Sequence, residues 1–202
     1  YAQIRVQERL PKSKTGFALT TAKTRAKIYY DVNDALVIKR SAELFARDIQ
    51  MVTGQKPELI QKRERAKALV IVGTIEKNQW ICELAQKGKI DIRPLQGAWE
   101  RYLIQTVDNP SPGVAKALVI AGSDRRGAAY GLFSISEMMG VSPWYWWGDV
   151  PVKTHKALYV DAPPTYSKTP SVKYRGIFLN DEDWGLKPWA AKTFEKERGN
   201  IG

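Results

Sequence analysis

Five residues near the carboxyl end of the sequence are of the types that hold or hydrolyse sugars. Asn180, Asp181, Glu182, Asp183 and Trp184 directly follow the stretch SVKYRGIFL (171–179). Carboxylates can act as acids, bases or acceptors for hydroxyl groups, and an amide and an aromatic ring beside them complete a common sugar-binding mixture. The alternative is a solvated acidic loop, which is common on protein surfaces.

The position of these residues supports the interpretation that they bind or hydrolyse a sugar. Residues 171–179 have a strand pattern, and α/β barrels keep their chemistry in the loops at the carboxyl ends of their strands. We therefore predict that 171–179 is the first strand of a truncated (β/α)8 barrel. Because Gly202 comes before any second strand could pair with it, this strand should lean on the preceding domain or be poorly ordered.

The segment from Gly122 to Gly131 joins a predicted strand to a predicted helix, where a phosphate group could bind. Its glycines are separated by four and then three residues, which does not match the dinucleotide fingerprint. A structural interpretation is that Gly127 and Gly131 let the helix pack close to the sheet.

Four consecutive aromatic residues, Trp144 to Trp147, form the second candidate sugar surface. Adjacent side chains cannot all point the same way, so we expect two or three of them at a domain seam, and a sugar platform stays the alternative. His155 has no Cys or His at ligand spacing, and Cys82 in an apolar helical stretch indicates an inert thiol. The sequence predicts no metal and no cofactor.

The first 165 residues predict alternating strands and helices. The clearest element is a helix with Asp34 as its N-cap and Gly54 at its end, because apolar residues recur at spacings of four and three between them. Those residues are Ile38, Ala42, Phe45, Ile49 and Val52. The other predicted elements are strands at 26–32, 68–72, 101–107, 116–121 and 157–160, helices at 78–86 and 123–140, and a turn at 109–113.

This order predicts an α/β fold in which a mixed β-sheet is layered with α-helices. The proline-containing loop DAPPTYSKTPS (161–171) has no apolar periodicity and is typical of a linker. We therefore predict two domains, an α/β accessory domain at 1–165 and a linker with the start of the catalytic barrel at 166–202.

The charge and composition exclude some classes of protein. The net charge is +11, but the Lys and Arg residues are scattered and no nucleic-acid-binding signature accompanies them, so we expect no nucleic-acid partner. A basic surface near an acidic polysaccharide is the favoured interpretation. The apolar runs are too short to cross a membrane, and no signal segment opens the sequence.

Two long motifs, AGSDRRGAAYGLFSISEMMGVSPWYWWGDVPV (121–152) and PSVKYRGIFLNDEDWG (170–185), resemble glycoside hydrolase family 115. The likeness extends over roughly residues 17–202. The resemblance implies an enzyme that removes glucuronic acid, or its 4-O-methyl ether, from glucuronoxylan with inversion at the anomeric carbon. It also implies an amino-terminal domain similar to the accessory domain of hexosaminidases, packed on a catalytic barrel.

The resemblance implies a role for each residue of the acidic loop. Asn180 and Asp181 would bind hydroxyl groups of the uronic acid, and Glu182, Asp183 and Trp184 would flank them. The general acid and base would lie on later barrel strands, so we expect no catalytic residue within these 202 residues and no activity from this chain alone.

Partners and location follow from the same resemblance. The expected partners are glucuronoxylan or its oligosaccharides and the rest of the catalytic barrel, with a homodimer left open. A plant polysaccharide is met outside the cytoplasm, so the protein is expected to be secreted or periplasmic. A carbohydrate-binding or docking module for acidic polysaccharide, without catalysis, remains the alternative function.

Overall fold

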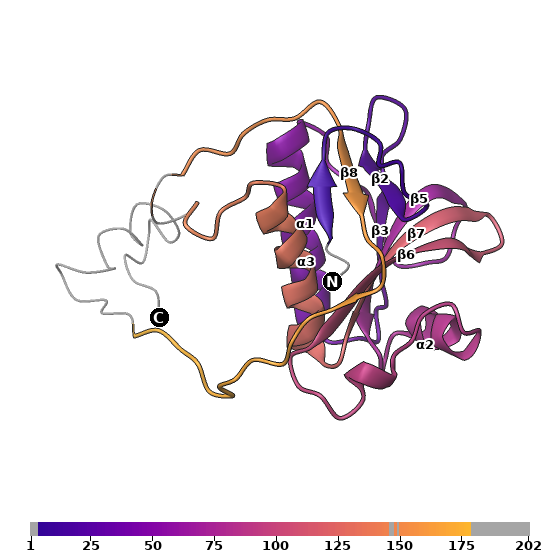
Figure 1. Cartoon of the computed structure of the whole chain (residues 1–202), viewed down its shortest axis with the longest axis vertical. Helices are drawn as coiled ribbons and strands as arrows, with labels where there is room; N and C mark the ends of the chain where they lie inside the picture. The colour runs from indigo at the N-terminus through magenta and orange to yellow at the C-terminus, as the bar shows by residue number, and fades with distance from the viewer. Residues whose placement is uncertain (1–3, 146–147, 149, 179–202) are drawn as a thin grey trace. The chain divides into compact units, whose positions relative to one another are not determined.

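A six-stranded mixed sheet lies at the centre of the computed structural model, which describes residues 4–145, 148 and 150–178 (Figure 1). The strand order is β4-β3-β5-β7-β6-β9. The first four strands in this order run parallel, and β6 and β9 are each antiparallel to their neighbours. The strands are β3 (Lys27–Tyr30), β4 (Leu59–Ile60), β5 (Ala66–Thr74), β6 (Tyr102–Ser111), β7 (Val114–Gly122) and β9 (Thr165–Tyr166).

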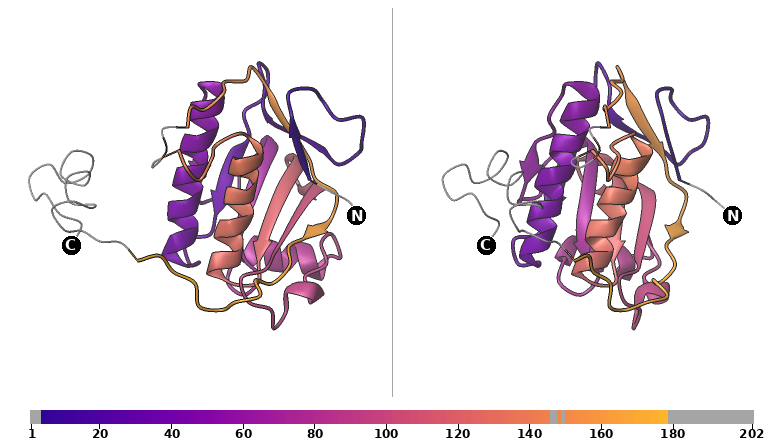
Figure 2. Two further views of the ribbon diagram at one scale, coloured as in Figure 1. Left: turned by 60° about the vertical axis from the view of Figure 1, so that its left-hand side comes forward. Right: turned by 90° about the vertical axis from the view of Figure 1, so that its left-hand side faces the viewer.

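The helices cover both faces of this sheet, as Figure 2 shows for α1 (Leu36–Thr53) and α3 (Arg125–Met138), which lie side by side on one face. The opposite face carries α2 (Gln79–Gln86) and a short 3-10 helix, η1 (Arg93–Leu95). Successive side chains of a strand point to opposite faces. Val70 and Val72 therefore pack with α1 and α3, whereas Leu69 and Ile71 pack with α2. The predicted layered α/β architecture is confirmed.

The helix α1 has the predicted buried stripe and the predicted end, but not the predicted cap. All five residues of the stripe are buried, and Gly54 ends the helix with a φ of 71°, in the left-handed region that favours glycine. Asp34 does not cap the helix, because the N-cap position is Ala35. The Asp34 carboxylate instead accepts a hydrogen bond from the Thr74 backbone N–H at 2.7 Å, which joins the loop after β3 to the end of β5.

The predicted close packing of α3 on the sheet is confirmed. A Cβ atom at Gly127 would lie 2.3 Å from the Arg101 carbonyl oxygen, and one at Gly131 would lie 2.6 Å from Ile120 Cγ2. Both distances are too short for a side chain, so α3 approaches β6 and β7 only because these two positions are glycine.

A second sheet was not predicted from the sequence. In it β1 (Arg5–Gln7) and β2 (Gly16–Thr20) flank β8 (Leu158–Asp161), and all pairs are antiparallel. Phe17, Leu19 and Val160 are fully buried and join the core on the α1 and α3 face. Only β8 matches a predicted strand, since β1 and β2 are short and their partner lies about 150 residues away in sequence.

The predicted linker is partly ordered. Thr165 and Tyr166 form β9 at the edge of the sheet, so the sheet extends past the predicted domain boundary at residue 165. Contacts along the chain define two units, Tyr1–Pro170 and Ser171–Gly202. No helix in the described part of the chain is long and apolar enough to span a membrane.

Candidate functional site

The predicted sugar-binding residues Asn180, Asp181, Glu182, Asp183 and Trp184 lie outside the described part of the chain. Of the strand predicted before them, residues 171–178 are described and have no strand structure. Their apolar side chains are open to solvent, with Tyr174 86% and Phe178 92% exposed. A strand forms only when a neighbour satisfies its backbone groups, and among the described residues none pairs with this segment. The barrel strand stays a prediction.

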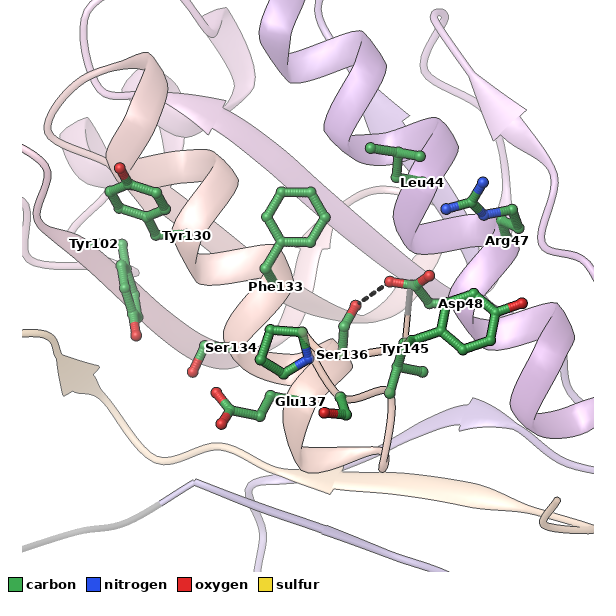
Figure 3. A pocket seen from close by; sticks show the side chains of 13 residues that line it. Leu44, Arg47, Asp48, Tyr102, Tyr130, Phe133, Ser134, Ser136, Glu137 and Tyr145 are labelled. Carbon is green, nitrogen blue, oxygen red and sulfur yellow. Dashed lines mark hydrogen bonds between the residues drawn. The ribbon is translucent and has the colours of Figure 1, made fainter. Parts of the chain in front are cut away.

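A hollow lies between α1, α3 and the segment that follows α3 (Figure 3). Its volume is about 470 Å³. Leu44 of α1 and Tyr130 and Phe133 of α3 line it, together with Tyr145 from the predicted aromatic cluster. The remaining described member of that cluster, Trp144, is 66% exposed, and Trp146 and Trp147 lie outside the described residues.

One carboxylate of this hollow is buried between the two helices. Asp48 of α1 is 6% exposed and accepts a 2.7 Å hydrogen bond from the Ser136 hydroxyl of α3 (Figure 3). Burial raises the pKa of Asp48, while the Ser136 hydrogen bond and the charge of Arg47 oppose that rise. Sequence reasoning missed this pair. The available signal was a charged residue flanking the apolar stripe of α1, three residues after Phe45.

The hollow is better suited to packing than to catalysis. An acid–base pair needs groups free to exchange protons with a substrate, but the Asp48 carboxylate is already engaged by Ser136. Leu44, Tyr130 and Phe133 are partly exposed apolar side chains of α1 and α3 that line the hollow, and we call these three residues the α1–α3 face. Such apolar faces mark contact surfaces for other polypeptide. Within the described ranges no group of three Cys, His, Asp or Glu residues could hold a metal ion.

The amino end of α3 is closed to phosphate. Asp124 is the N-cap, and its Oδ1 accepts hydrogen bonds from Arg126 N at 2.9 Å and Gly127 N at 2.8 Å. Its Oδ2 accepts a third from Glu100 N at 2.7 Å. The N–H groups that a phosphate would need are occupied by a carboxylate, which would also repel it. The phosphate interpretation of this segment is therefore wrong.

The carboxyl ends of β3 and β5 are closed in the same way. After β3 the chain continues into α1 on one face of the sheet, and after β5 it continues into α2 on the other face. In α/β sheets the space between two such neighbouring strand ends commonly binds a ligand. Here the Asp34 side chain fills the space, together with Asn78, whose amide donates to the Val72 carbonyl at 3.0 Å. A Cβ at Gly73 would already clash with both side chains.

A set of hydrogen bonds fixes the segment that leads out of the sheet. Arg101 donates to the Ser167 carbonyl at 2.6 Å and to the Pro94 carbonyl at 2.9 Å, and its guanidinium lies 5.7 Å from the Tyr166 ring centroid. Tyr102 and Ser167 are joined by two further hydrogen bonds of 2.9 Å, one backbone and one through the Ser167 hydroxyl. The chain is therefore tied to β6 at residue 167, just before the predicted barrel segment.

The sequence from this anchor onward, residues 167–201, matches the family model described as glycosyl hydrolase family 115. A solved structure covers the preceding domain as well. It is described as a family 115 4-O-methyl-α-glucuronidase, BtGH115A, with specificity for decorated arabinogalactans, and it is 34% identical over 89% of this chain with a TM-score of 0.70. The chain belongs to glycosyl hydrolase family 115.

This family 115 chain spans 22% of the length of that relative. A family 20 β-N-acetylhexosaminidase from Streptomyces coelicolor A3(2) is 12% identical, with 81% of this chain and 25% of that chain covered and a TM-score of 0.41. No protein in the curated set matches the sequence. The family match includes residues 180–184, whereas the α1–α3 face belongs to the preceding domain.

Proposed function

We propose that this chain is the amino-terminal part of an inverting α-glucuronidase that removes glucuronic acid or 4-O-methylglucuronic acid side chains from glucuronoxylan. The observation that carries the proposal is the 34% identity over 89% of the chain to a family 115 4-O-methyl-α-glucuronidase. The match of residues 167–201 to the family model extends the same relationship through the acidic loop.

The substrate-binding role falls to the loop after the first barrel strand. Asn180 and Asp181 hydrogen-bond the hydroxyl groups of the uronic acid, and Glu182, Asp183 and Trp184 flank it. Inversion needs a general acid and a general base on opposite sides of the sugar, about 6.5 to 9.5 Å apart. Both come from barrel strands outside these 202 residues, so the chain alone releases no uronic acid.

The α1–α3 face serves as the docking surface for the remainder of the enzyme. It carries half-exposed Leu44, Tyr130 and Phe133 around a hollow and more exposed Trp144 beside it. The relative's chain is more than four times as long as the matched part, so it supplies ample polypeptide to cover such a face. Burial of apolar surface stabilises an interface by about 25 cal/mol per Å².

Arabinogalactan is a second candidate for the polymer that carries the uronic acid. The relative is described as specific for decorated arabinogalactans, which favours arabinogalactan side chains as an alternative substrate to glucuronoxylan. Either polymer is met outside the cytoplasm, so we propose a secreted or periplasmic location.

The deciding experiment measures uronic acid release by the longer enzyme that contains this chain, with glucuronoxylan and arabinogalactan as separate substrates. Three proteins are compared: the native enzyme, Asp181→Ala and Glu76→Ala, in which an exposed carboxylate of the first unit is removed as a control. The expected result is release by the native enzyme and by Glu76→Ala, and a loss of about 10- to 100-fold in Asp181→Ala with unchanged folding, because a hydrogen bond to a charged group contributes about 1.5 to 3 kcal/mol.

Each other outcome has a definite meaning. Release by Asp181→Ala at the native rate would remove the proposed site while keeping the enzyme. Absence of release from both polymers by the native protein would overturn the glucuronidase proposal and leave the non-catalytic binding module.

A further inference from the structure

The tip of the β6–β7 hairpin lies at the amino ends of β5 and β7 (Figure 1). It carries a basic surface, at the opposite end of these strands from Asp34, which bonds the end of β5. Two open grooves of about 480 and 350 Å³ lie on either side of the hairpin tip, and both are lined by Asn109 and Gly113. Four cationic side chains line the grooves, two in each: Arg65 and Lys67, then Lys87 and Lys89. We call these four residues and the tip at 109–113 the hairpin surface.

The acidic residues nearby are engaged mainly with other cations. Asp108 lies 3.1 Å from Lys116 Nζ. Glu83 accepts two hydrogen bonds of 2.7 and 2.8 Å from the Arg63 guanidinium, while Lys87 Nζ is 4.0 Å from it. The shortest contacts of the Asp108 and Glu83 carboxylates are with Lys116 and Arg63, which are not part of the hairpin surface. The hairpin surface therefore keeps an excess of positive charge that attracts a polyanion.

Hydrogen bonds fix the tip of the hairpin. Gly113 has a φ of 85°, and its carbonyl accepts a 3.0 Å hydrogen bond from Ala66 N, which fixes the tip to the start of β5. Lys89 Nζ donates to the Asn109 carbonyl and ties the second groove to the same tip. The hairpin tip and the Lys89 ammonium group are therefore held in place, which lowers the ordering cost of binding at this point.

We propose that the hairpin surface binds the carboxylate groups of a uronic-acid-bearing polysaccharide. This inference rests on the proposed function, since it assumes that the protein meets such a polymer. An arginine fork pairs with a carboxylate in two hydrogen bonds, and lysines add mobile point charges for groups at irregular spacing. Pro112 beside them is exposed and offers apolar contact for a sugar ring.

The same surface is poorly built for single-stranded nucleic acid. Proteins that bind it combine a basic groove with aromatic rings on which bases stack. The described residues that line the two grooves include no aromatic side chain. The charge and the groove therefore favour a sugar chain with scattered carboxylates.

The test uses the full 202-residue chain in affinity electrophoresis and calorimetry with glucuronoxylan. The same polymer, with its carboxyl groups chemically reduced to alcohols, keeps the backbone and removes the charge. The test variant is Arg65→Gln/Lys67→Gln/Lys87→Gln. The control, Lys39→Gln/Arg40→Gln/Arg125→Gln, removes equal charge from α1 and α3.

The expected result is retention of the native chain and of the control by glucuronoxylan but not by the reduced polymer. The test variant binds about tenfold more weakly or worse, since it loses three cations and each lost ion pair contributes up to about fivefold. Equal weakening in the control, or equal binding to the reduced polymer, would overturn the proposal. Tighter binding to duplex DNA than to glucuronoxylan at the same salt concentration would overturn it in favour of nucleic acid.

This binding assay is independent of hydrolysis. If the longer enzyme releases no uronic acid but the chain binds glucuronoxylan through the hairpin surface, the proposed function fails and the binding inference stands. If release occurs and the test variant binds as the native chain does, the reverse holds.

Discussion

The Ser136 hydroxyl donates a 2.7 Å hydrogen bond to the Asp48 carboxylate, and this contact joins α3 to α1 across the buried floor of the hollow. Figure 3 shows this hydrogen bond between the two helices. A buried carboxylate costs free energy when it is charged, and a single hydroxyl donor offsets part of that cost. The stability of the first unit should therefore depend on the protonation of Asp48.

The Asp48→Asn variant tests this dependence on pH. Burial raises the pKa of Asp48 in the folded protein, so the native state holds the proton more tightly than the unfolded chain does. The free energy of unfolding consequently falls as the pH rises from below the ordinary carboxyl pKa through the raised one. The asparagine side chain of the variant cannot ionise and its oxygen can still accept from Ser136, so the variant lacks this fall.

Chemical unfolding should show Asp48→Asn more stable than the native chain at neutral pH, with the difference shrinking in acid. The two proteins are compared at neutral and at acidic pH, because the titration of Asp48 is what makes their difference in unfolding free energy depend on pH. A variant less stable than the native chain at neutral pH would contradict the assignment.

The Ser136→Ala variant should have the opposite effect. It removes the hydroxyl that donates to Asp48 and leaves a buried carboxylate oxygen without that hydrogen bond, which costs about 1 to 3 kcal/mol. Urea unfolding at neutral pH measures this loss. In the double variant Asp48→Asn/Ser136→Ala the loss should be smaller, because a neutral amide is cheaper to bury than a charge. An unchanged unfolding midpoint in the single variant would show that the hydrogen bond contributes nothing.

Gly127→Ala should destabilise the first unit by about 1 to 3 kcal/mol, because the new methyl group would meet the Arg101 backbone at 2.3 Å and backbone cannot move aside cheaply. Gly176→Ala is the matched control, since a Cβ there meets nothing within 4 Å. Thermal unfolding should separate the two variants. Equal unfolding temperatures would mean that α3 does not approach β6 as closely as described.

Arg101→Gln should loosen the exit of the chain from the sheet. The variant loses the hydrogen bonds to the Ser167 and Pro94 carbonyls and the contact with the Tyr166 ring. Amide hydrogen exchange at Ser167, whose N–H bonds the Tyr102 carbonyl, should speed up by about tenfold, corresponding to a loss of about 1.4 kcal/mol of local stability. Amides in the middle of β5 should be unaffected. Unchanged exchange at Ser167 would show that β9 is held by its own backbone bonds.

The proposed docking role of the α1–α3 face predicts a difference between the chain and the longer enzyme. Leu44→Ser/Phe133→Ser changes two half-exposed residues, so it should cost little in this chain but about 2 kcal/mol or more in the longer enzyme, where both would be fully buried. Leu10→Ser, at an exposed position away from this face, is the control and should be neutral in both. Equal effects of the double variant in the two proteins would exclude docking through this face.

The sequence by itself determined the family, the three α-helices and four strands of the main sheet, β3, β5, β6 and β7, but not its short strands β4 and β9. Each of the predicted elements has a local sequence pattern, because it depends on residues that are close together along the chain. The patterns are the apolar run of β5, the apolar stripe and terminal Gly54 of α1, and the two glycines of α3. The binding role of residues 180–184 stays a prediction, because these residues lie outside the described part of the chain.

Only the tertiary structure decided the contacts between distant residues. Asp34 is of a residue type favoured at the N-cap and comes directly before the apolar stripe of α1. Its carboxylate nevertheless accepts a hydrogen bond from Thr74, 40 residues away, because β3 and β5 are neighbours in the sheet. The same holds for Asp48 with Ser136 and for the pairing of β1 with β8. A side chain or a short strand takes the partner that folding brings within hydrogen-bonding distance, and a local pattern carries no information about a residue on the order of a hundred positions away.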